Sequence, residues 1–225
     1  ESGERVMAND YFDFAGSTTV WDVQTGGPVE TSEGALTAFG AGEDRIECVH
    51  DTEVRVRRGD ATVRQWPIED DCVTLRVADD REHIATAGRD STLRVFSISE
   101  GDEVGAWPFG LSGDIDLSAD AELVAVSGAP EETLVVDPSR GIAWRLRGWS
   151  SRWDVAVDLS TRTVVTTGPS GTQIWSLDSY GERTATPMQG DTLFKGFVAP
   201  DGAVVTISVS DGTSRAFVER RGPEG

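Results

Sequence analysis

Short runs of apolar and β-branched residues recur along the whole chain, separated by turns rich in Gly, Asp, Ser and Pro. One run, with threonine at its second place, returns at intervals of 34 to 41 residues. Its six copies are STTVWDV from Ser17, DTEVRVR from Asp51, STLRVFS from Ser91, ETLVVDP from Glu132, GTQIWSL from Gly171 and GTSRAFV from Gly212. Short runs of this kind between turn residues indicate β-strands, and no window has a sustained helical period.

Three further runs accompany each threonine segment and predict four strands in each repeat. The run that directly precedes the threonine segment is, for example, RVMAND from Arg5 or VAVSG from Val124. The run before that one is, for example, DIDLS from Asp114. The run after the threonine segment is VRQWP from Val63 or VGAWP from Val104. The repeat units are approximately 1–27, 28–60, 61–102, 103–141, 142–182 and 183–222.

Four short strands every forty residues or so predict an all-β chain built as a β-propeller. A single four-stranded sheet cannot bury both of its faces, whereas sheets fanned around an axis cover one another. About six blades are visible in 1–225 as one domain. The first unit starts at its second strand and the last ends after its third. We therefore expect residues outside this sequence, in a larger protein, to complete a ring of six or seven blades.

On these segments the chain resembles the WD40 repeat family, with degenerate repeats. Trp21 and Asp22 fill the position that names the family, and Phe96, Trp175 and Phe217 stand in or near that place elsewhere. We expect Trp21 to pack between blades and Asp22 to close a turn. The family's Gly-His pair is absent, so its buried hydrogen-bond tetrad is not expected.

Charge and reactive residues narrow the range of functions. The chain has 39 acidic and 20 basic residues, a net charge of −19 that repels nucleic acid and anionic membranes. Cys48 and Cys72 lie in apolar runs and are expected to be buried free thiols. The histidines, His50 and His83, are remote from each other in the repeat register, so no metal site is predicted. No nucleophile or phosphate-loop motif is present, and neither enzymatic activity nor a cofactor is expected.

Aromatic residues and arginine gather in the loops that a propeller presents on one face. These are the loops joining second to third strands, and fourth strands to the next first strand. Residues of these types dominate interface hot spots, so we expect a protein partner, or another domain of the same protein, to bind there. The candidate contacts are Tyr11, Phe12, Phe109, Trp149, Arg152 and Trp153. The alternative for each ring is packing between blades or at the mouth of the channel.

The resemblance implies a scaffold or sensor domain of a larger bacterial signalling or defence protein. A cytoplasmic location is expected, although the N-terminus, without a signal-peptide pattern, says little about compartment. Two alternatives stay open. One is an enzymatic propeller, of lactonase or dehydrogenase type, with a metal at the top of its channel. The other is a purely structural spacer.

Overall fold

The structure of the chain is a computed structural model. It describes residues 5–10, 17–33, 35–40, 44–49, 53–68, 72–129, 132–147, 154–168, 171–178, 181–187, 191–198, 204–210 and 216–221. These residues form 22 strands and no helix. The prediction of an all-β chain is therefore confirmed for the part that the structure describes.

The strands form six antiparallel sheets, called here sheets A to F, each with its strands in chain order. Sheet A contains β1 (Arg5–Asp10), β2 (Ser17–Asp22) and β3 (Pro28–Glu33), and sheet B contains β4 (Ala35–Phe39), β5 (Asp44–Val49), β6 (Glu53–Arg58) and β7 (Ala61–Pro67). Sheet C contains β8 (Cys72–Val77), β9 (His83–Gly88), β10 (Thr92–Ser97) and β11 (Glu103–Pro108). Sheet D contains β12 (Leu111–Leu117), β13 (Val124–Ala129), β14 (Glu132–Asp137) and β15 (Ile142–Arg147). Sheet E contains β16 (Asp154–Asp158), β17 (Thr163–Gly168), β18 (Gly171–Ser176) and β19 (Gly181–Pro187). Sheet F contains β20 (Asp191–Val198), β21 (Val204–Ser210) and β22 (Ala216–Arg221).

The sheets group the strands differently from the repeat units counted along the sequence. The unit 28–60, for example, takes in β3 from sheet A and the first three strands of sheet B. The offset arises because each unit ends after its threonine segment, which contributes to β2, the second strand of sheet A, and to the third strand of sheets B to F. The four short strands expected in each repeat are present in sheets B, C, D and E.

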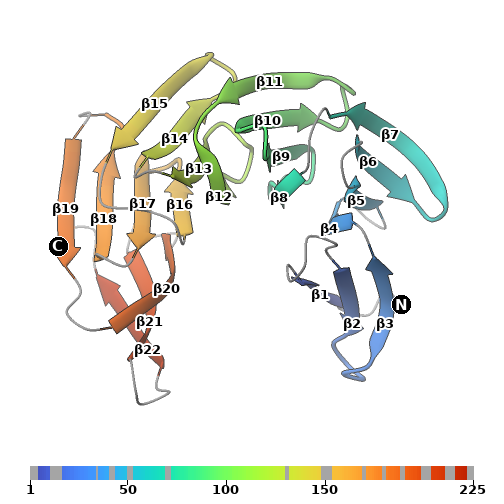
Figure 1. The fold of residues 1–225 in the computed structure, drawn as a ribbon, viewed down its shortest axis with the longest axis horizontal. Coiled ribbons are helices and arrows are strands. Elements are labelled where there is room, and N and C mark those ends of the chain that lie inside the picture. Colours follow the sequence, from blue (N-terminus) through green and yellow to red (C-terminus); the bar gives the residue numbers. More distant parts are fainter. Residues whose placement is uncertain are drawn as a thin grey trace.

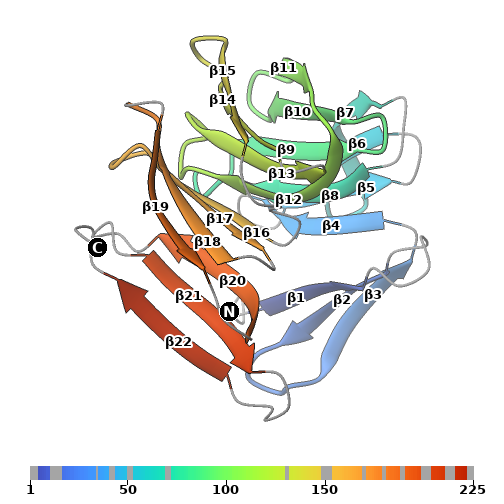
Figure 2. The same ribbon diagram turned by 60° about the vertical axis from the view of Figure 1, so that its left-hand side comes forward.

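The six sheets follow one another around an arc (Figure 1). The first strands of consecutive sheets lie next to each other, β4 beside β8, β8 beside β12, β12 beside β16, and β16 beside β20. Among the described residues, no extensive contact joins sheet A to sheet F. Figure 1 shows the first strands on the inside of the arc and the fourth strands β7, β11, β15 and β19 on its outer rim. A view turned by 60° shows the sheets fanned, each with a face toward the next (Figure 2).

Apolar side chains fill the spaces between the sheets in the middle of the series. Because neighbouring residues of a strand point to opposite faces, a sheet can offer one apolar set to the sheet before it and another to the sheet after it. Sheets B and C share a cluster that contains Ile46, Val54, Val56, Trp66, Leu75, Ile84 and Phe96. Similar clusters join sheet C to D and sheet D to E. The core is thus a row of layers between sheets.

Tryptophans of the outer strands bridge consecutive sheets, a role that the sequence did not reveal. The indole Nε1 of Trp66 in sheet B donates to the Gly101 carbonyl of sheet C at 3.1 Å. Its ring centroid lies 5.1 Å from that of Phe96. In sheet D, the Trp144 ring lies 5.7 Å from the guanidinium carbon of Arg162, a residue of sheet E's β16–β17 turn. These aromatic contacts tie the outer rim of one sheet to the next.

The Trp21–Asp22 pair has one of the two features expected of it. A carboxylate oxygen of Asp22 accepts the Thr25 N–H at 2.8 Å, which confirms that this aspartate closes a turn. The Trp21 side chain is half-buried. Its packing between blades stays a prediction.

Cys48 and Cys72 form a disulfide, so the prediction of two free thiols is wrong. Cys48 belongs to β5 and Cys72 to β8, and their Cα atoms are 6.1 Å apart. They meet because β5 and β8 lie on adjacent sheets, which a separation of 24 residues along the chain does not reveal. Disulfides persist mainly in oxidising compartments, so this bond disagrees with the expected cytoplasmic location.

A turn between β9 and β10 provides a test of backbone strain. Ser91 has a φ of 59°, in the left-handed region that costs a residue with a Cβ atom about 1 kcal/mol. Replacing Ser91 by glycine should therefore raise the free energy of unfolding by about 1 kcal/mol in urea denaturation. Gly59 has a similar φ of 58° and open space around its would-be Cβ, so Gly59→Ala should lower stability by a similar amount. Equal changes of the same sign would contradict this reading.

Candidate functional site

Two described connections meet at the end of the sheets where a binding face was predicted. The Phe109 N–H, between β11 and β12, donates to the Ser91 carbonyl, between β9 and β10, at 2.8 Å. A second-to-third connection therefore lies against a fourth-to-first connection. Asp90 organises this end, because its carboxylate accepts the Thr92 N–H at 3.0 Å and pairs with Arg94. The two loop types share one face here, as the binding prediction requires.

Phe109 alone among the predicted contact residues lies in the described part of the chain. Its side chain is only 9% exposed and packs in the cluster between sheets C and D. This is the packing alternative, so Phe109 is not carried forward as a contact residue. The sequence carries a sign that Phe109 is a core residue. Trp-Pro-Phe ends at Phe109 after β11, just as Trp-Pro-Ile ends at Ile68 after β7, and Ile68 is also buried.

The other predicted contacts stay predictions. They lie outside the described residues and are Tyr11, Phe12, Trp149, Arg152 and Trp153. His50 also lies outside them. The structure shows only that the two loop types meet near Phe109, and partner binding at this face stays a prediction.

Charged groups on the first strands form a second candidate site, on the inside of the arc. Arg76 of β8 pairs with Asp114 of β12 at 2.7 Å. A bulge in β12, between Ser112 and Ile115, sets the position of Asp114. Gly113 is required in this bulge, because a Cβ atom there would lie 2.5 Å from the Ser127 hydroxyl. That hydroxyl accepts the Asp114 N–H at 2.9 Å and so holds the bulge in place.

Asp116, two residues further along β12, links sheet D to sheet E. Its carboxylate accepts the Val157 N–H of β16 at 2.8 Å. Burial raises the pKa of the Asp116 carboxyl above its usual value, although hydrogen bonds from the Val157 and Leu117 N–H groups act in the opposite direction. The arrangement joins three consecutive first strands by polar bonds. Within the described residues, no group of three His, Cys, Asp or Glu side chains could hold a metal ion.

The raised pKa of Asp116 predicts how stability depends on pH. The folded state holds the proton to higher pH than the unfolded state, so stability is lost as pH rises through the raised pKa. Asn at position 116 can still accept the Val157 N–H without a charge to bury. The stability of Asp116→Asn relative to wild type should therefore increase between about pH 3 and pH 7 in urea titrations.

Asp158 is the matched control, with a pKa shift of opposite sign. Burial acts to raise the pKa of this carboxyl, but hydrogen bonds from Thr161 and Ser160 outweigh it and lower the pKa overall. Asp158 therefore contributes stability above its unfolded pKa that disappears as pH falls. Asp158→Asn should be less stable than wild type at pH 7 and equal to it in strong acid. The same pH trend for both variants would contradict these assignments.

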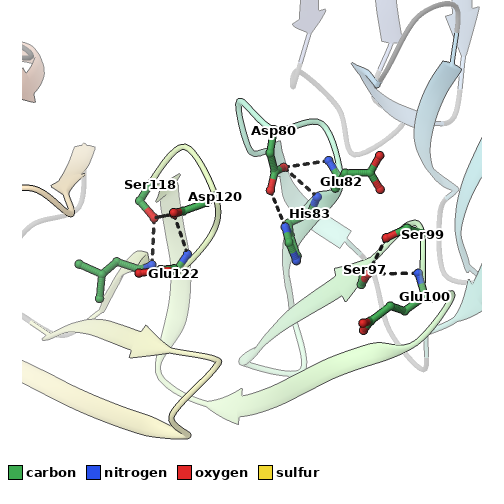
Figure 3. A network of polar contacts seen from close by, with 10 residues as sticks. Asp80, Glu82, His83, Ser97, Ser99, Glu100, Ser118, Asp120 and Glu122 are labelled. Atoms are coloured by element: carbon green, nitrogen blue, oxygen red, sulfur yellow. Dashed lines mark hydrogen bonds and ion pairs between the residues drawn. The ribbon is translucent and has the colours of Figure 1, made fainter.

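The turns at the opposite end of sheets C and D are closed by local polar contacts (Figure 3). Asp80 accepts the Glu82 N–H at 2.8 Å and contacts the His83 ring at 2.6 Å. In the next sheet, the Ser118 hydroxyl accepts the Leu123 N–H at 3.0 Å. The Asp80 N–H donates to the Ala119 carbonyl at 2.8 Å and joins the two turns. These side chains satisfy backbone groups of the turns, the usual role of Asp and Ser in such positions.

Comparison with known proteins adds no relative. No family model matches the sequence, and no characterised protein matches it closely enough to count as a relative. Among the described residues, no helix has the length and apolar character needed to cross a membrane.

Proposed function

We propose that the chain is a WD40-like β-propeller that presents a rigid loop face to a protein partner, without catalysis of its own. The observation that carries this proposal is the succession of first strands from β4 to β20, each beside the next on the inside of the arc. Sheets arranged in this way behave as consecutive blades, each covered by its neighbours. Strand order and pairing within the sheets fit the same interpretation.

The layers between the sheets support a platform that changes little in shape when it binds. Clusters of buried apolar residues, the Cys48–Cys72 disulfide and the Trp66 and Trp144 contacts each join one sheet to the next. A platform of this kind positions its loops in advance, which lowers the entropy lost on binding. The function would be that of a scaffold or sensor domain in a larger bacterial signalling or defence protein.

The partner would contact the face where second-to-third and fourth-to-first connections meet. The proposed contacts are Tyr11, Phe12, Trp149, Arg152 and Trp153. Aromatic side chains in loops can bury large areas with few rotatable bonds, and arginine adds several hydrogen-bond donors, as in interface hot spots. No nucleic acid or anionic membrane is expected to take part, because the net charge of −19 repels polyanions.

A comparison of two variants tests the loop face. The first replaces Tyr11, Phe12, Trp149 and Trp153 by alanine, and the control replaces the exposed outer-strand residues Val63 and Val104 by alanine. Protein retained from the native host by wild type should also be retained by the control and lost by the loop variant. Both variants should keep the unfolding temperature of wild type. Equal retention by the loop variant would contradict the proposed face.

A further inference from the structure

The face of sheet B that is turned toward sheet A is charged, unlike the matching faces of sheets C, D and E. In each of those three sheets, a pair of opposite residues on the second and third strands packs on the preceding sheet. The pairs are Ile84 with Phe96, Val124 with Val136, and Val164 with Trp175. They belong to the apolar layers that join sheets B to C, C to D and D to E. The pair at the matching place in sheet B is Arg45 with Arg57.

The alternation of side chains along β5 and β6 shows which face these arginines occupy. Ile46 and Val56, the next opposite pair, are fully buried in the layer between sheets B and C. Because neighbouring residues of a strand point to opposite faces, Arg45 and Arg57 lie on the other face of sheet B. Figure 1 shows sheet B between sheets C and A in the arc, and β4 lies beside β1 and β2. The charged face is therefore the one that is turned toward sheet A.

A buried carboxylate of the same sheet pairs with the arginines of this face. The Glu47 carboxylate lies 2.6 Å from the Nε of Arg55 and 3.7 Å from a terminal nitrogen of Arg57. The side chains of Arg55 and Arg57 are 29% and 28% exposed, whereas Phe96 and Val136, at the place of Arg57 in sheets C and D, are fully buried. Water therefore reaches this face of sheet B and is excluded from the matching positions of the next two sheets.

A charged face stabilises the packing of sheet A on sheet B only weakly. Burial of apolar area is the main favourable contribution to such packing, and no apolar cluster of the described residues joins these two sheets. Ion pairs that leave water contribute little net free energy, because the lost hydration offsets their attraction. The pairs of Glu47 also lie within sheet B, so they do not tie sheet B to sheet A. Sheet A is thus held less strongly than sheets B to E hold one another.

We propose that sheet A opens from sheet B as a separate unit while sheets B to E stay packed. A small sheet needs another layer against its apolar face to be stable in water, so β1, β2 and β3 lose their pairing when they leave sheet B. Sheets B to E keep their apolar layers and the Cys48–Cys72 bond in the open state. Tyr11 and Phe12 lie between β1 and β2 in the chain, so opening displaces two proposed contacts. Only this last consequence rests on the proposed function.

Native-state hydrogen exchange, followed amide by amide in the whole chain, tests the opening without any substitution. The strands that carry the threonine segment in sheets A, C and D are β2, β10 and β14. Amides of β2 should exchange at least about a hundredfold faster than those of β10 and β14. Low concentrations of urea should raise the rates in β2 less than those in β10 and β14, because opening of sheet A exposes less surface than global unfolding. Equal rates, or equal dependence on urea, would overturn the proposal.

A double variant tests whether the charged face is the cause. Arg45→Val with Arg57→Val gives sheet B the valine pair of sheet D and should slow exchange in β2 at least about tenfold, because sheet A then packs on an apolar face. The control, Arg140→Val with Arg145→Val, removes the same charge from sheet D and should leave β2 unchanged. Unchanged exchange in the first variant, or equal slowing by both, would contradict the proposal. Should the first variant fail to fold by circular dichroism, Arg57→Val alone replaces it, with slowing again expected.

Val20→Ala tests the junction from the side of sheet A. Val20 lies on β2 and is only 3% exposed, so its truncation should raise exchange in β2 about tenfold and leave β10 unchanged. The matched control is Val135→Ala, in the layer between sheets D and E, which should leave exchange in β2 unchanged because β2 opens without unfolding of sheet D. Acceleration of β10 by Val20→Ala, or of β2 by Val135→Ala, to the same extent as in the truncated sheet would show a single cooperative unit and would overturn the proposal.

Discussion

Phe96→Ala should lower the free energy of unfolding by about 4 kcal/mol, the largest effect expected of a single substitution here. The ring is fully buried between sheets B and C and lies against the Trp66 ring. Its removal deletes apolar contacts with both sheets and leaves a cavity that the strands cannot close without changing their pairing. Urea denaturation followed by tryptophan fluorescence and circular dichroism measures the change.

Two controls show whether the loss comes from the layer between the sheets. Val63→Ala, on the outer strand of sheet B with 37% of its side chain exposed, should cost less than about 0.5 kcal/mol. A double-mutant cycle of Phe96→Ala with Trp66→Ala should give a coupling of about 1 kcal/mol, because the two rings touch. A cost for Phe96→Ala similar to that of Val63→Ala would show that sheets B and C do not pack as described.

Removal of the disulfide should have the second-largest effect. Replacing both Cys48 and Cys72 by alanine should lower the free energy of unfolding by about 3 kcal/mol, since the bond closes a loop of 24 residues in the unfolded chain. It also releases the covalent link between β5 and β8. Denaturation of the variant and of wild type, each with and without a dithiol reductant, measures the contribution.

The reductant provides the internal control for this prediction. It should bring wild type close to the stability of the double variant and leave the variant unchanged. Alkylation in denaturant without reductant, which exposes any free thiol, should label neither cysteine of wild type. Two labelled cysteines and no effect of reductant would mean that the thiols are free, as the sequence alone had predicted.

The strands themselves could be predicted from the sequence because their signals are local. A short apolar run such as VAVSG from Val124, bounded by turn residues, predicts a strand from local sequence alone, and β13 begins at that residue. The repetition of these runs also indicated four strands to a sheet. Asp22 could likewise be assigned to a turn, because aspartate at the end of a strand commonly accepts a nearby backbone N–H.

Contacts between sheets could not be predicted in the same way. The Cys48–Cys72 bond and the Trp66–Gly101 hydrogen bond each join residues that only the packing of sheet B on sheet C brings together. Threonine spacing was an imperfect guide to register. In sheet D, Thr133 pairs with Ser127 across the turn between the second and third strands. At the matching position in sheet C, Leu93 pairs with Ala87, so Thr92 stands one residue before the position that Thr133 occupies.

The candidate site was predictable only in part, for a related reason. Phe109 is a large aromatic residue in a loop, a description that fits both a binding contact and a core residue. The buried position of its ring follows from the bond between its N–H and Ser91, which turns the chain back over the sheet.

A crystal structure of the chain would show whether consecutive antiparallel sheets fan around a common axis with their first strands innermost. We expect it to place β4, β8, β12, β16 and β20 side by side around that axis, with the Phe96 ring between sheets B and C. Two sheets stacked as a sandwich, or first strands of consecutive sheets that do not touch, would contradict this arrangement.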